Sequence, residues 1–523
     1  MNAHKLLVAA VAVCLSSAVA QAHEGDDKLG KVTFPTSCQP SVQHDFEDGV
    51  AMLHSYWFGI AGKTFRSILE KDPACVMAYW GIALDLLGNT LAFPPSAKDA
   101  QTAWEALEKA HALGARTARE GEWIEAVSAY FRDHGKTPVD ARLKAYNAAM
   151  ERVAQKYPDD VEAQVFYALT LQASASHSDV SYASQIKSAA MLEKLYQQNP
   201  QHPGVTHFLI HAYDFPPLAD KGIAPARRYA GVAPAVPHAR HMPSHIYSMV
   251  GLWEESIASN LAALEIQPDY YHAYDFAVYA ALQLGQDARA KMMADKAATT
   301  PVRGDRPSGP GTFTALAAMP ARQALERGDW AAAAALPITA SRFAQADSLT
   351  RFARGLGMAR AGDPAGAKAE IAAMETLRAA LQKADQAYWA DRTDEQILAV
   401  SAWLALKEGN TAQAVKLMRA AADGEDGSVK NVLMENRLYP LRELLADLLL
   451  DAGQASAALQ EYEVAVKTYP NRYRGLWGAV QAATAAGERG KTADYMGKFA
   501  ALARTADGSR PETARAKAYT AQR

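Results

Sequence analysis

The sequence has little cysteine, no marked excess of charge of either sign and few long apolar runs. Only three of its 523 residues are cysteine, and Lys plus Arg total 54 against 57 Asp plus Glu, a net charge of -3. This balance lacks the basic excess of a general nucleic-acid-binding protein. Beyond residue 22 no apolar run reaches the length of about 18 residues that indicates a membrane span, so no span is expected there.

Several enzyme signatures are also missing. The chain contains no P-loop, no G-x-G-x-x-G after a predicted strand, no G-x-S-x-G and no H-E-x-x-H. A Ser/His/Asp triad remains open, because its members need not be close in sequence. Runs of alternating β-branched residues are missing too, whereas apolar residues recur at helical spacing nearly everywhere. With 49% hydrophobic residues, the composition indicates a globular, mainly helical protein.

Residues 1–22 have the pattern of a secretory signal peptide. An apolar run from Leu6 to Leu15 is followed by small residues that end in two A-x-A sites. The run is too short to span a bilayer, and the sites place cleavage after Ala20 or Ala22. We therefore expect a periplasmic or secreted protein. Cleavage after Ala22 would also expose His23 as an N-terminal residue able to chelate copper, a minor alternative.

Two cysteines remain after the predicted signal peptide, Cys38 and Cys75. In an oxidising compartment an even pair is most simply a disulfide. The alternative is two separate buried thiols.

Glycines close helical patterns at a recurrent spacing. They stand at Gly251, Gly285, Gly328, Gly362, Gly409, Gly453 and Gly487, and three of the six gaps are 34 residues. The other gaps are 43, 47 and 44 residues, as expected for one repeat with an insertion. A period near 34 with paired helices is typical of a tetratricopeptide array.

Two stretches carry the residues of that repeat. One has the turn glycine, small contact residue, aromatic, small residue and stop proline in order: Gly453, Ala458, Tyr462, Ala465 and Pro470. The other repeats the second half and opens the next unit: Ala61, Phe65, Ile68, Pro73 and Tyr79. The chain thus resembles tetratricopeptide repeat proteins over most of residues 40–500, with degenerate units near 90–140 and 370–440. The resemblance implies an all-α helical solenoid.

A second resemblance is narrower. The peptide HARHMPSHIYSMVGLWEESI (238–257) and the stretch 75–81 resemble a group of secreted bacterial tetratricopeptide proteins without a settled activity. This resemblance implies periplasmic placement and a shared histidine-bearing unit, and supplies no catalytic assignment.

The array is expected in two parts. The segment AATTPVRGDRPSGPGT (297–312) is rich in Pro and Gly and cannot be helical throughout. We therefore predict an N-terminal array over 23–299, a linker over 300–312 and a C-terminal array over 313–505. A polar tail, 506–523, is expected to fray.

Histidines are concentrated in one part of the chain. Six of the fourteen lie between residues 202 and 245: His202, His207, His211, His238, His241 and His245. The pairs 207/211 and 241/245 have the i,i+4 spacing that places two imidazoles on one helix face. Each member of the second pair also stands 34 residues after its counterpart in the first. In a tetratricopeptide array, residues one repeat apart lie side by side on the first helices, which line the concave groove.

These spacings predict a transition-metal site. The expected ligands are His207, His211, His241 and His245, with His238, His272 and Asp275 as further candidates. Imidazole-rich sites suit Zn, Cu, Ni or Fe, and Zn and Cu are favoured here. Because Pro243 is expected to begin a helix, we place His238 and His241 on the loop that leads into it.

Three functions follow as hypotheses. The first is an exported scaffold that binds a transition metal in the groove of the N-terminal array. The second is a metal-dependent hydrolytic or oxidative enzyme at the same site, with Asp275, Asp214 or Glu254 as the candidate base. The third is a metal-free scaffold that binds a peptide or protein in the groove; histidines that merely pack and cap helices are a further alternative.

Two other features of the sequence allow predictions about single segments. The segment Arg227-Arg228-Tyr229 could bind a carboxylate or phosphate, although a solvated helix face is the commoner arrangement. The aromatic residues Tyr56, Trp57, Phe58, Tyr79 and Trp80 are expected to pack between helices in the core.

Overall fold

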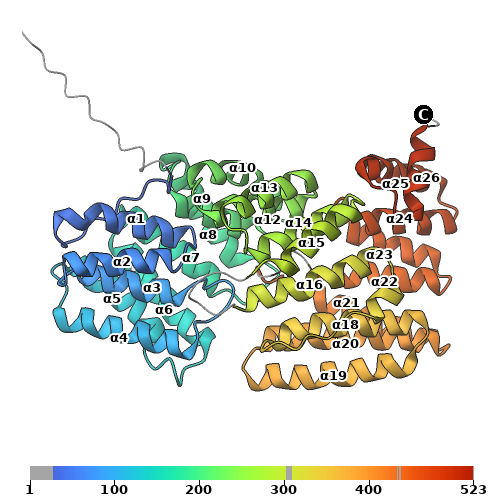
Figure 1. The fold of residues 1–523 in the computed structure, drawn as a ribbon, viewed down its shortest axis with the longest axis horizontal. Coiled ribbons are helices and arrows are strands. Elements are labelled where there is room, and N and C mark those ends of the chain that lie inside the picture. The colour runs from blue at the N-terminus through green and yellow to red at the C-terminus, as the bar shows by residue number, and fades with distance from the viewer. Residues whose placement is uncertain (1–27, 302–308, 433, 435–436, 522–523) are drawn as a thin grey trace, which may run out of the picture.

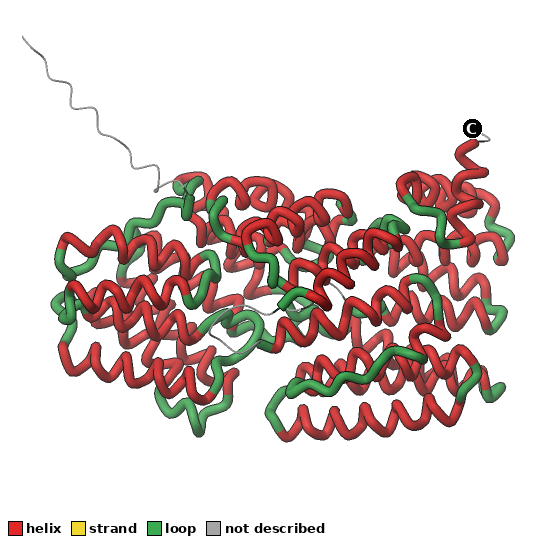
Figure 2. Tube along the Cα trace, viewed as in Figure 1, coloured by secondary structure: helices red, strands yellow, loops and turns green. Residues whose placement is uncertain are grey.

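The computed structural model describes residues 28–301, 309–432, 434 and 437–521. The predicted signal peptide and His23 lie outside these residues. Throughout the described part the regular elements are helices, joined by turns and loops (Figures 1 and 2). The predicted all-α class is therefore confirmed.

The helices follow the chain across an elongated molecule, from the blue end at the left of Figure 1 to the red end at the right. The first group is η1 (Pro40–Val42), α1 (Gln43–His54), α2 (Ile60–Lys71), α3 (Val76–Leu87), α4 (Ala97–Leu113), α5 (Ala118–Phe131), α6 (Val139–Lys156), α7 (Val161–Ala173) and α8 (Ala183–Gln198). The second is α9 (Pro203–Tyr213), η2 (Ala219–Gly222), α10 (Ile223–Val232), α11 (Pro237–His241), α12 (Pro243–Val250), α13 (Trp253–Ile266), α14 (Tyr271–Gln283) and α15 (Asp287–Thr299).

The remaining helices cover the region predicted as the C-terminal array and the tail that follows it. They are α16 (Pro310–Glu326), α17 (Trp330–Ala334), α18 (Ala344–Ala361), α19 (Pro364–Lys383), α20 (Ala387–Lys407), α21 (Thr411–Asp426), α22 (Leu441–Asp451), α23 (Ala455–Thr468), α24 (Tyr473–Ala485), α25 (Arg489–Leu502), η3 (Ala503–Thr505) and α26 (Pro511–Ala521). No helix of the described residues is both long enough and apolar enough to cross a membrane.

The repeat glycines and aromatics have the roles that the sequence predicts. All seven turn glycines have positive φ values, a conformation that other residues adopt at a cost. Between the helices, the small residues leave room for the aromatic side chain. Gly478 on α24 lies against the ring of Tyr462 on α23, and Gly49 and Gly81 lie against Phe65 on α2.

The boundary between the two predicted arrays is less sharp than expected. α15 ends at Thr299 and α16 begins at Pro310, inside the predicted linker 300–312. α16 packs against both α14 and α15, so the helical stack continues across this point.

The predicted frayed tail is wrong for residues 506–521. Residues 511–521 form α26, and Arg510 just before it is buried in an ion pair with Asp287 of α15 at 2.6 Å. Arg510 also donates to the backbone carbonyl of Leu282 at 3.0 Å. The polar composition of this segment concealed a buried arginine whose partner lies more than 200 residues away in sequence.

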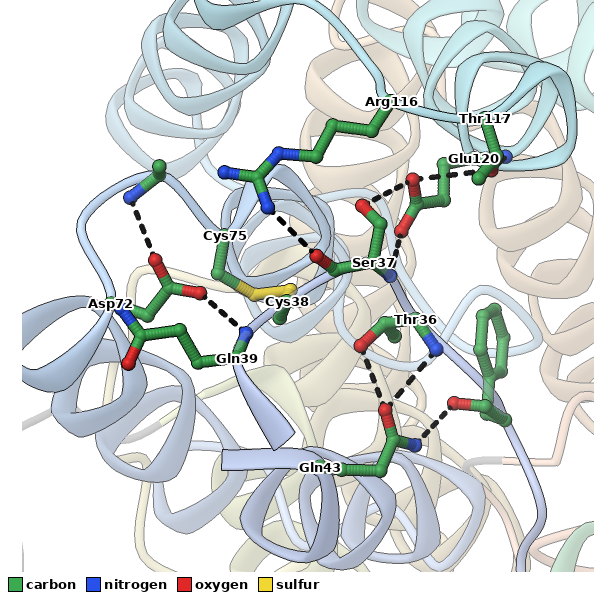
Figure 3. The surroundings of a disulfide bond; sticks show 12 residues. Thr36, Ser37, Cys38, Gln39, Gln43, Asp72, Cys75, Arg116, Thr117 and Glu120 are labelled. Carbon is green, nitrogen blue, oxygen red and sulfur yellow. Dashed lines mark hydrogen bonds between the residues drawn. A yellow bond between two sulfur atoms is a disulfide. The ribbon is translucent and has the colours of Figure 1, made fainter. Parts of the chain in front are cut away.

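Cys38 and Cys75 form a disulfide (Figure 3). Cys75 precedes α3, and the bond ties the segment before η1 to the turn between α2 and α3. The carboxylate of Asp72 in this turn accepts the backbone N–H of Gln39 at 2.8 Å. The disulfide therefore holds the segment before η1 against the first helices of the stack.

The five predicted core aromatics have different environments. Trp80 is fully buried and contacts Trp123 with ring centroids 5.6 Å apart. Tyr79 and Phe58 pack against the same group of buried apolar side chains as Trp80. Trp57 packs against a second apolar group, which includes side chains of α9 and α10. Tyr56 instead lies against a group of histidine rings.

Candidate metal centre

The predicted histidines come from four short segments of adjoining helices. α9 carries His207 and His211, and α12 carries His245. α12 contacts both α9 and α14, in the green central part of Figure 1. The remaining members, His238 and His241 on α11 and His272 on α14, stand near the starts of these helices or just before α12.

The predicted loop before Pro243 is wrong. Pro237 begins the short helix α11, which holds His238 and His241, and Pro243 begins α12 directly after it. Met242 between them keeps a helical backbone, with φ -53° and ψ -34°. Each proline occupies the first position of a helix, where a missing N–H costs nothing. His241 and His245 therefore approach each other across a helical junction.

The six histidines fall into two triads. His207, His211 and His238 form triad A, and His241, His245 and His272 form triad B; within each triad one ring nitrogen of each residue lies within 4.8 Å of one ring nitrogen of the other two. The Nε2 atoms of His207 and His238 are 3.0 Å apart, and so are those of His241 and His245. All four histidines of the original ligand prediction are brought together.

The two triads are contiguous. The ring centroids of His211 and His245 are 5.8 Å apart, and those of His238 and His241 are 5.9 Å apart. His207, His211, His241 and His245 are at most 3% exposed, whereas His238 and His272 are half-buried. Each triad therefore contains one histidine that is not fully buried.

Hydrogen bonds fix which nitrogen of several rings carries the proton. Nδ1 of His207 donates to the backbone carbonyl of His54 at 2.6 Å. Nδ1 of His241 faces Oδ1 of Asn260 at 2.6 Å. Because the Asn260 amide nitrogen donates to the carbonyl of Ser256, its oxygen must face His241, and Nδ1 of His241 is the donor.

The Nδ1 atoms of His245 and His238 also have hydrogen-bond partners outside the triads. Nδ1 of His245 donates to Oδ2 of Asp214 at 2.8 Å. Nδ1 of His238 lies 2.8 Å from the hydroxyl of Tyr270, which can donate or accept. Outward bonds from one imidazole nitrogen to a carboxylate, amide or carbonyl are typical of histidines that ligate a metal through the other nitrogen.

In triad B these bonds have an electrostatic consequence. With Nδ1 protonated on both neutral rings, the Nε2 atoms of His241 and His245 each present a lone pair across 3.0 Å. Two facing lone pairs repel each other unless a proton or a metal ion lies between them.

Burial disfavours protonation of these rings. It lowers the pKa of His207 to about 3 and that of His241 to about 4. Burial, reinforced by the neighbouring imidazoles, holds the pKa values of His211, His238, His245 and His272 well below 6.5. At neutral pH the cluster therefore consists of neutral imidazoles, the form that ligates metal.

Several buried polar atoms at the cluster have no hydrogen-bond partner among the described residues. These are both ring nitrogens of His211, the hydroxyl of Tyr56 and Oδ1 of Asp214. The Tyr56 ring packs on His207 and His238 with centroid distances of 4.6 and 5.2 Å. An unsatisfied buried polar atom costs about 1–3 kcal/mol, so a group of them indicates a site built for a polar occupant.

Residues distant in sequence enclose the cluster. Lys430, from the loop between α21 and α22, reaches across from the C-terminal array and donates to Asp214 Oδ2 at 2.9 Å. Tyr229 stacks on His207 with an interplanar angle of 13° and donates to the hydroxyl of Ser55. The site is therefore a buried centre within the N-terminal array, covered in part by Lys430 of the C-terminal array, rather than an open groove.

Asp214 is the one candidate base that reaches the histidines. Asp275 pairs instead with the buried Arg322 of α16 at 3.0 Å. Glu254 is exposed and accepts hydrogen bonds from Gln286, just before α15, and from Arg289 on α15. The structure thus places Asp275 and Glu254 outside both triads.

A separate buried group lies beside the cluster and was not predicted. Glu162 accepts hydrogen bonds from His54 Nε2 at 2.7 Å and from His202 Nε2 at 2.8 Å. His202 also caps α9, because its Nδ1 accepts the backbone N–H of Val205. Burial alone would raise the pKa of Glu162, but the two imidazoles outweigh burial and lower the pKa to about 2. This arrangement is an ionised carboxylate held by two N–H donors.

The segment 227–229 does not form a joint anion site. Arg227 is exposed, Arg228 lies over the ring of Tyr196, and Tyr229 is buried at the histidine cluster. The three side chains therefore point to different surroundings.

The histidine spacing predicted which histidines come together but not the residues that hold them in place. Asn260 and Tyr270 are close in sequence to the histidines, yet an amide and a phenol give no metal signal. The other supports are His54 at the end of α1, Tyr56 in the turn after it, Glu162 on α7 and Lys430 in the C-terminal array, so no local spacing connects them to the histidines. One further signal was present: His272 stands 34 residues after His238.

Comparisons with known proteins bear on the fold. No family model and no curated protein matches the chain. The solved structure of Ypp1 is similar over 88% of this chain and 81% of its own, with 9% identity and a TM-score of 0.50. Cut9, in a complex with Hcn1, is similar over 92% of this chain and 77% of its own, with 11% identity and a TM-score of 0.39. The TPR domain of P58(IPK) is similar over 86% of this chain and 99% of its own, with 13% identity and a TM-score of 0.22.

The fold assignment rests on the likeness to Ypp1 and on the chain's own helix pairs with their 34-residue spacing. The chain is a tetratricopeptide-type helical solenoid.

Proposed function

We propose that this protein is an exported helical solenoid that binds a transition metal, Zn or Cu, through its buried histidine cluster. The observation that carries the proposal is the pair of Nε2 atoms of His241 and His245, 3.0 Å apart, with both Nδ1 protons donated to other acceptors. A cation between the two Nε2 atoms removes this repulsion, because both lone pairs can then bind the cation.

The spacing of the nitrogens suits an ion. Two nitrogens on a tetrahedral ion with bonds of about 2.0–2.1 Å lie about 3.3 Å apart. Small adjustments of the rings would bring the observed 3.0 Å pairs to that distance. The unpartnered nitrogens of His211 supply a further ligand without breaking a hydrogen bond.

Burial favours an ion over a peptide at this location. Tyr229 stacks on the cluster and Lys430 reaches it from the other array, so a peptide backbone has little access to the imidazoles. A peptide or protein partner is compatible with the rest of the solenoid surface, as the architecture implies, and no described contact selects a partner there.

A metal-dependent enzyme is the second candidate function. Two observations favour it: Oδ1 of Asp214 and the hydroxyl of Tyr56 are buried beside the histidines without partners. Asp214 could hold a proton at Oδ1 while Oδ2 stays bound to His245 and Lys430. A resident ion would supply Lewis acidity at an open position.

Metal analysis tests the proposal. The purified protein is loaded separately with Zn and Cu, dialysed and assayed for bound metal, beside a variant with His207, His211, His241 and His245 all changed to Ala. We expect tight binding by the parent, none by the variant, and unchanged binding by a control with the exposed His44 changed to Ala. Far-UV circular dichroism establishes that each variant is folded.

A parent protein that retains neither metal after loading would refute the proposal. The parent also gives a test without substitution, because Co or Cu bound to imidazole nitrogens has characteristic absorption and nitrogen hyperfine signals. Oxygen-only ligation in those spectra would refute the ligand assignment.

A further inference from the structure

The two histidine triads are copies of each other within the repeat. Each residue of triad B stands 34 residues after its counterpart in triad A: His207 with His241, His211 with His245, and His238 with His272. Since 34 residues is the period of the turn glycines, a complete three-histidine ligand set occurs twice.

The structural positions of the copies also correspond. The third histidine of each triad is the second residue of a helix, His238 on α11 and His272 on α14. In each triad this residue is half-buried while the other two are buried. Each triad also holds one pair of Nε2 atoms 3.0 Å apart, between the first and third members in triad A and the first and second members in triad B. The repeat therefore reproduces the residue types, their places on the helices and their burial, while the rings within each triad are oriented differently.

We propose that the cluster is a two-metal centre, in which triad A and triad B each bind one Zn or Cu ion. This inference rests on the proposed function and adds the number of ions and their division between the triads. Three imidazole nitrogens leave at least one position on each ion for another ligand. The contacts between His211 and His245 and between His238 and His241 make the two sites neighbours.

Charge indicates the class of that additional ligand. Two divalent ions bring four positive charges to six neutral imidazoles. The carboxylate bonded directly to a triad is that of Asp214, and it is already paired with Lys430. The ions are therefore expected to carry hydroxide, whose negative charge offsets theirs in this buried setting. It would enter beside His238 in triad A and beside His272 in triad B, the two histidines that are only half-buried.

The number of ions per chain tests the inference. The full-length protein is loaded with Zn or with Cu, dialysed, and its metal content measured per chain for the parent, His238→Ala, His272→Ala and the control His44→Ala. We expect two ions in the parent and control and one in each triad variant. Each of these two variants removes one imidazole from one triad and leaves the other triad complete.

The possible outcomes separate the two proposals. No ion in the parent refutes both. One ion in the parent, removed by the fourfold histidine variant described above, leaves the proposed function standing and overturns the two-metal centre. Two ions in the parent with two, or none, in either triad variant overturns the assignment of one ion to each triad. The parent measurement decides between one and two ions even if a variant fails to fold.

Discussion

Asn260 holds His241 in one tautomer. Its amide nitrogen is committed to the carbonyl of Ser256 in its own helix, so its oxygen is the only group it can offer to the ring. The side chain thereby determines that Nε2 of His241 presents a lone pair to His245. A residue with no unusual spacing thus sets the chemistry of a residue that the sequence identified.

Replacing Asn260 tests this role. We expect Asn260→Ala to weaken metal binding by about 10–100-fold, as is typical when the partner of a ligating histidine is lost. Asn260→Asp keeps an acceptor for Nδ1 and should retain most of the affinity. Competition titration with a chromogenic chelator measures both; equal affinity in Asn260→Ala and the parent would contradict the role.

Glu162 makes the stability of the protein depend on pH in the acid range. Its pKa falls from 4.5 to about 2 on folding, because His54 and His202 both donate to it. A carboxyl group with a lowered folded-state pKa stabilises the native state above its unfolded pKa, and that stability is lost as the pH falls through the folded value. The loss should therefore span about pH 4.5 down to 2.

Comparison with Glu162→Gln isolates this contribution. A shift of this size corresponds to about 3 kcal/mol of unfolding free energy. We expect the parent to exceed the variant in stability at pH 6, and the difference to shrink steadily below pH 4.5. Urea denaturation at a series of pH values measures it; a difference that stays constant down to pH 3 would contradict the lowered pKa.

Residues that occupy equivalent positions of the repeat could be predicted from the sequence, whereas residues whose contacts are set by a distant partner could not. His207, His211, His241 and His245 share helix faces and repeat positions, so their meeting could be predicted. Asp275 has the same register as His241, yet the buried Arg322 of α16 binds its carboxylate. Glu254 lies on the second helix of its unit and faces Arg289. The position of a residue in the repeat predicts where it lies on a helix, but the charged groups nearby determine which partner its side chain binds.

At the scale of helices, the approach of α1 to α9 depends on a missing side chain. A Cβ atom at Gly204 in α9 would overlap the ring of His54 in α1. The same contact brings the His54 carbonyl to Nδ1 of His207. Close packing of these two helices therefore supports triad A.

A pair of glycine substitutions tests this packing. Gly204→Ala should destabilise the protein by about 1–3 kcal/mol, the usual cost of overpacking, and should weaken metal binding at triad A. Gly231 in α10 has nothing within 4 Å of an added Cβ, so Gly231→Ala should stabilise by about 0.5 kcal/mol through helix propensity. Denaturant unfolding measures both, and similar effects of the two substitutions would contradict the proposed contact.

Across the whole molecule, the predicted repeat accounts for the helices and their turns but not for how the arrays meet. The 34-residue spacing, the turn glycines and the small residues around Phe65 and Tyr462 are local patterns, and each predicted its structure. The contact between the arrays joins Trp253 to the carbonyl of Asn471 and Gln283 to the N–H of Tyr473. The residues of such pairs are about 200 positions apart in the sequence and carry ordinary polar groups. No periodic pattern of the sequence therefore predicts that they are in contact.

Arg472 lies at the centre of this contact. The guanidinium is fully buried and bonds Glu443 of α22 at 2.7 Å and Glu326 of α16 at 2.8 Å, and it also donates to the hydroxyl of Tyr279 in α14. Helices of both arrays thus share one buried cation. Because losing it would strand two buried carboxylates, the arrays should unfold together in the parent protein.

Arg472→Met tests the cooperativity of the whole molecule. Removing one partner of a buried ion pair costs about 3–5 kcal/mol, whereas Lys291→Met, which breaks an exposed pair with Asp295, should change stability by less than about 0.5 kcal/mol. Tryptophan fluorescence and far-UV circular dichroism should follow one transition in the parent, since buried tryptophans lie in both arrays, Trp80 and Trp403 among them. Separate transitions in the parent, or a stability of Arg472→Met equal to that of Lys291→Met, would show that the arrays are joined some other way.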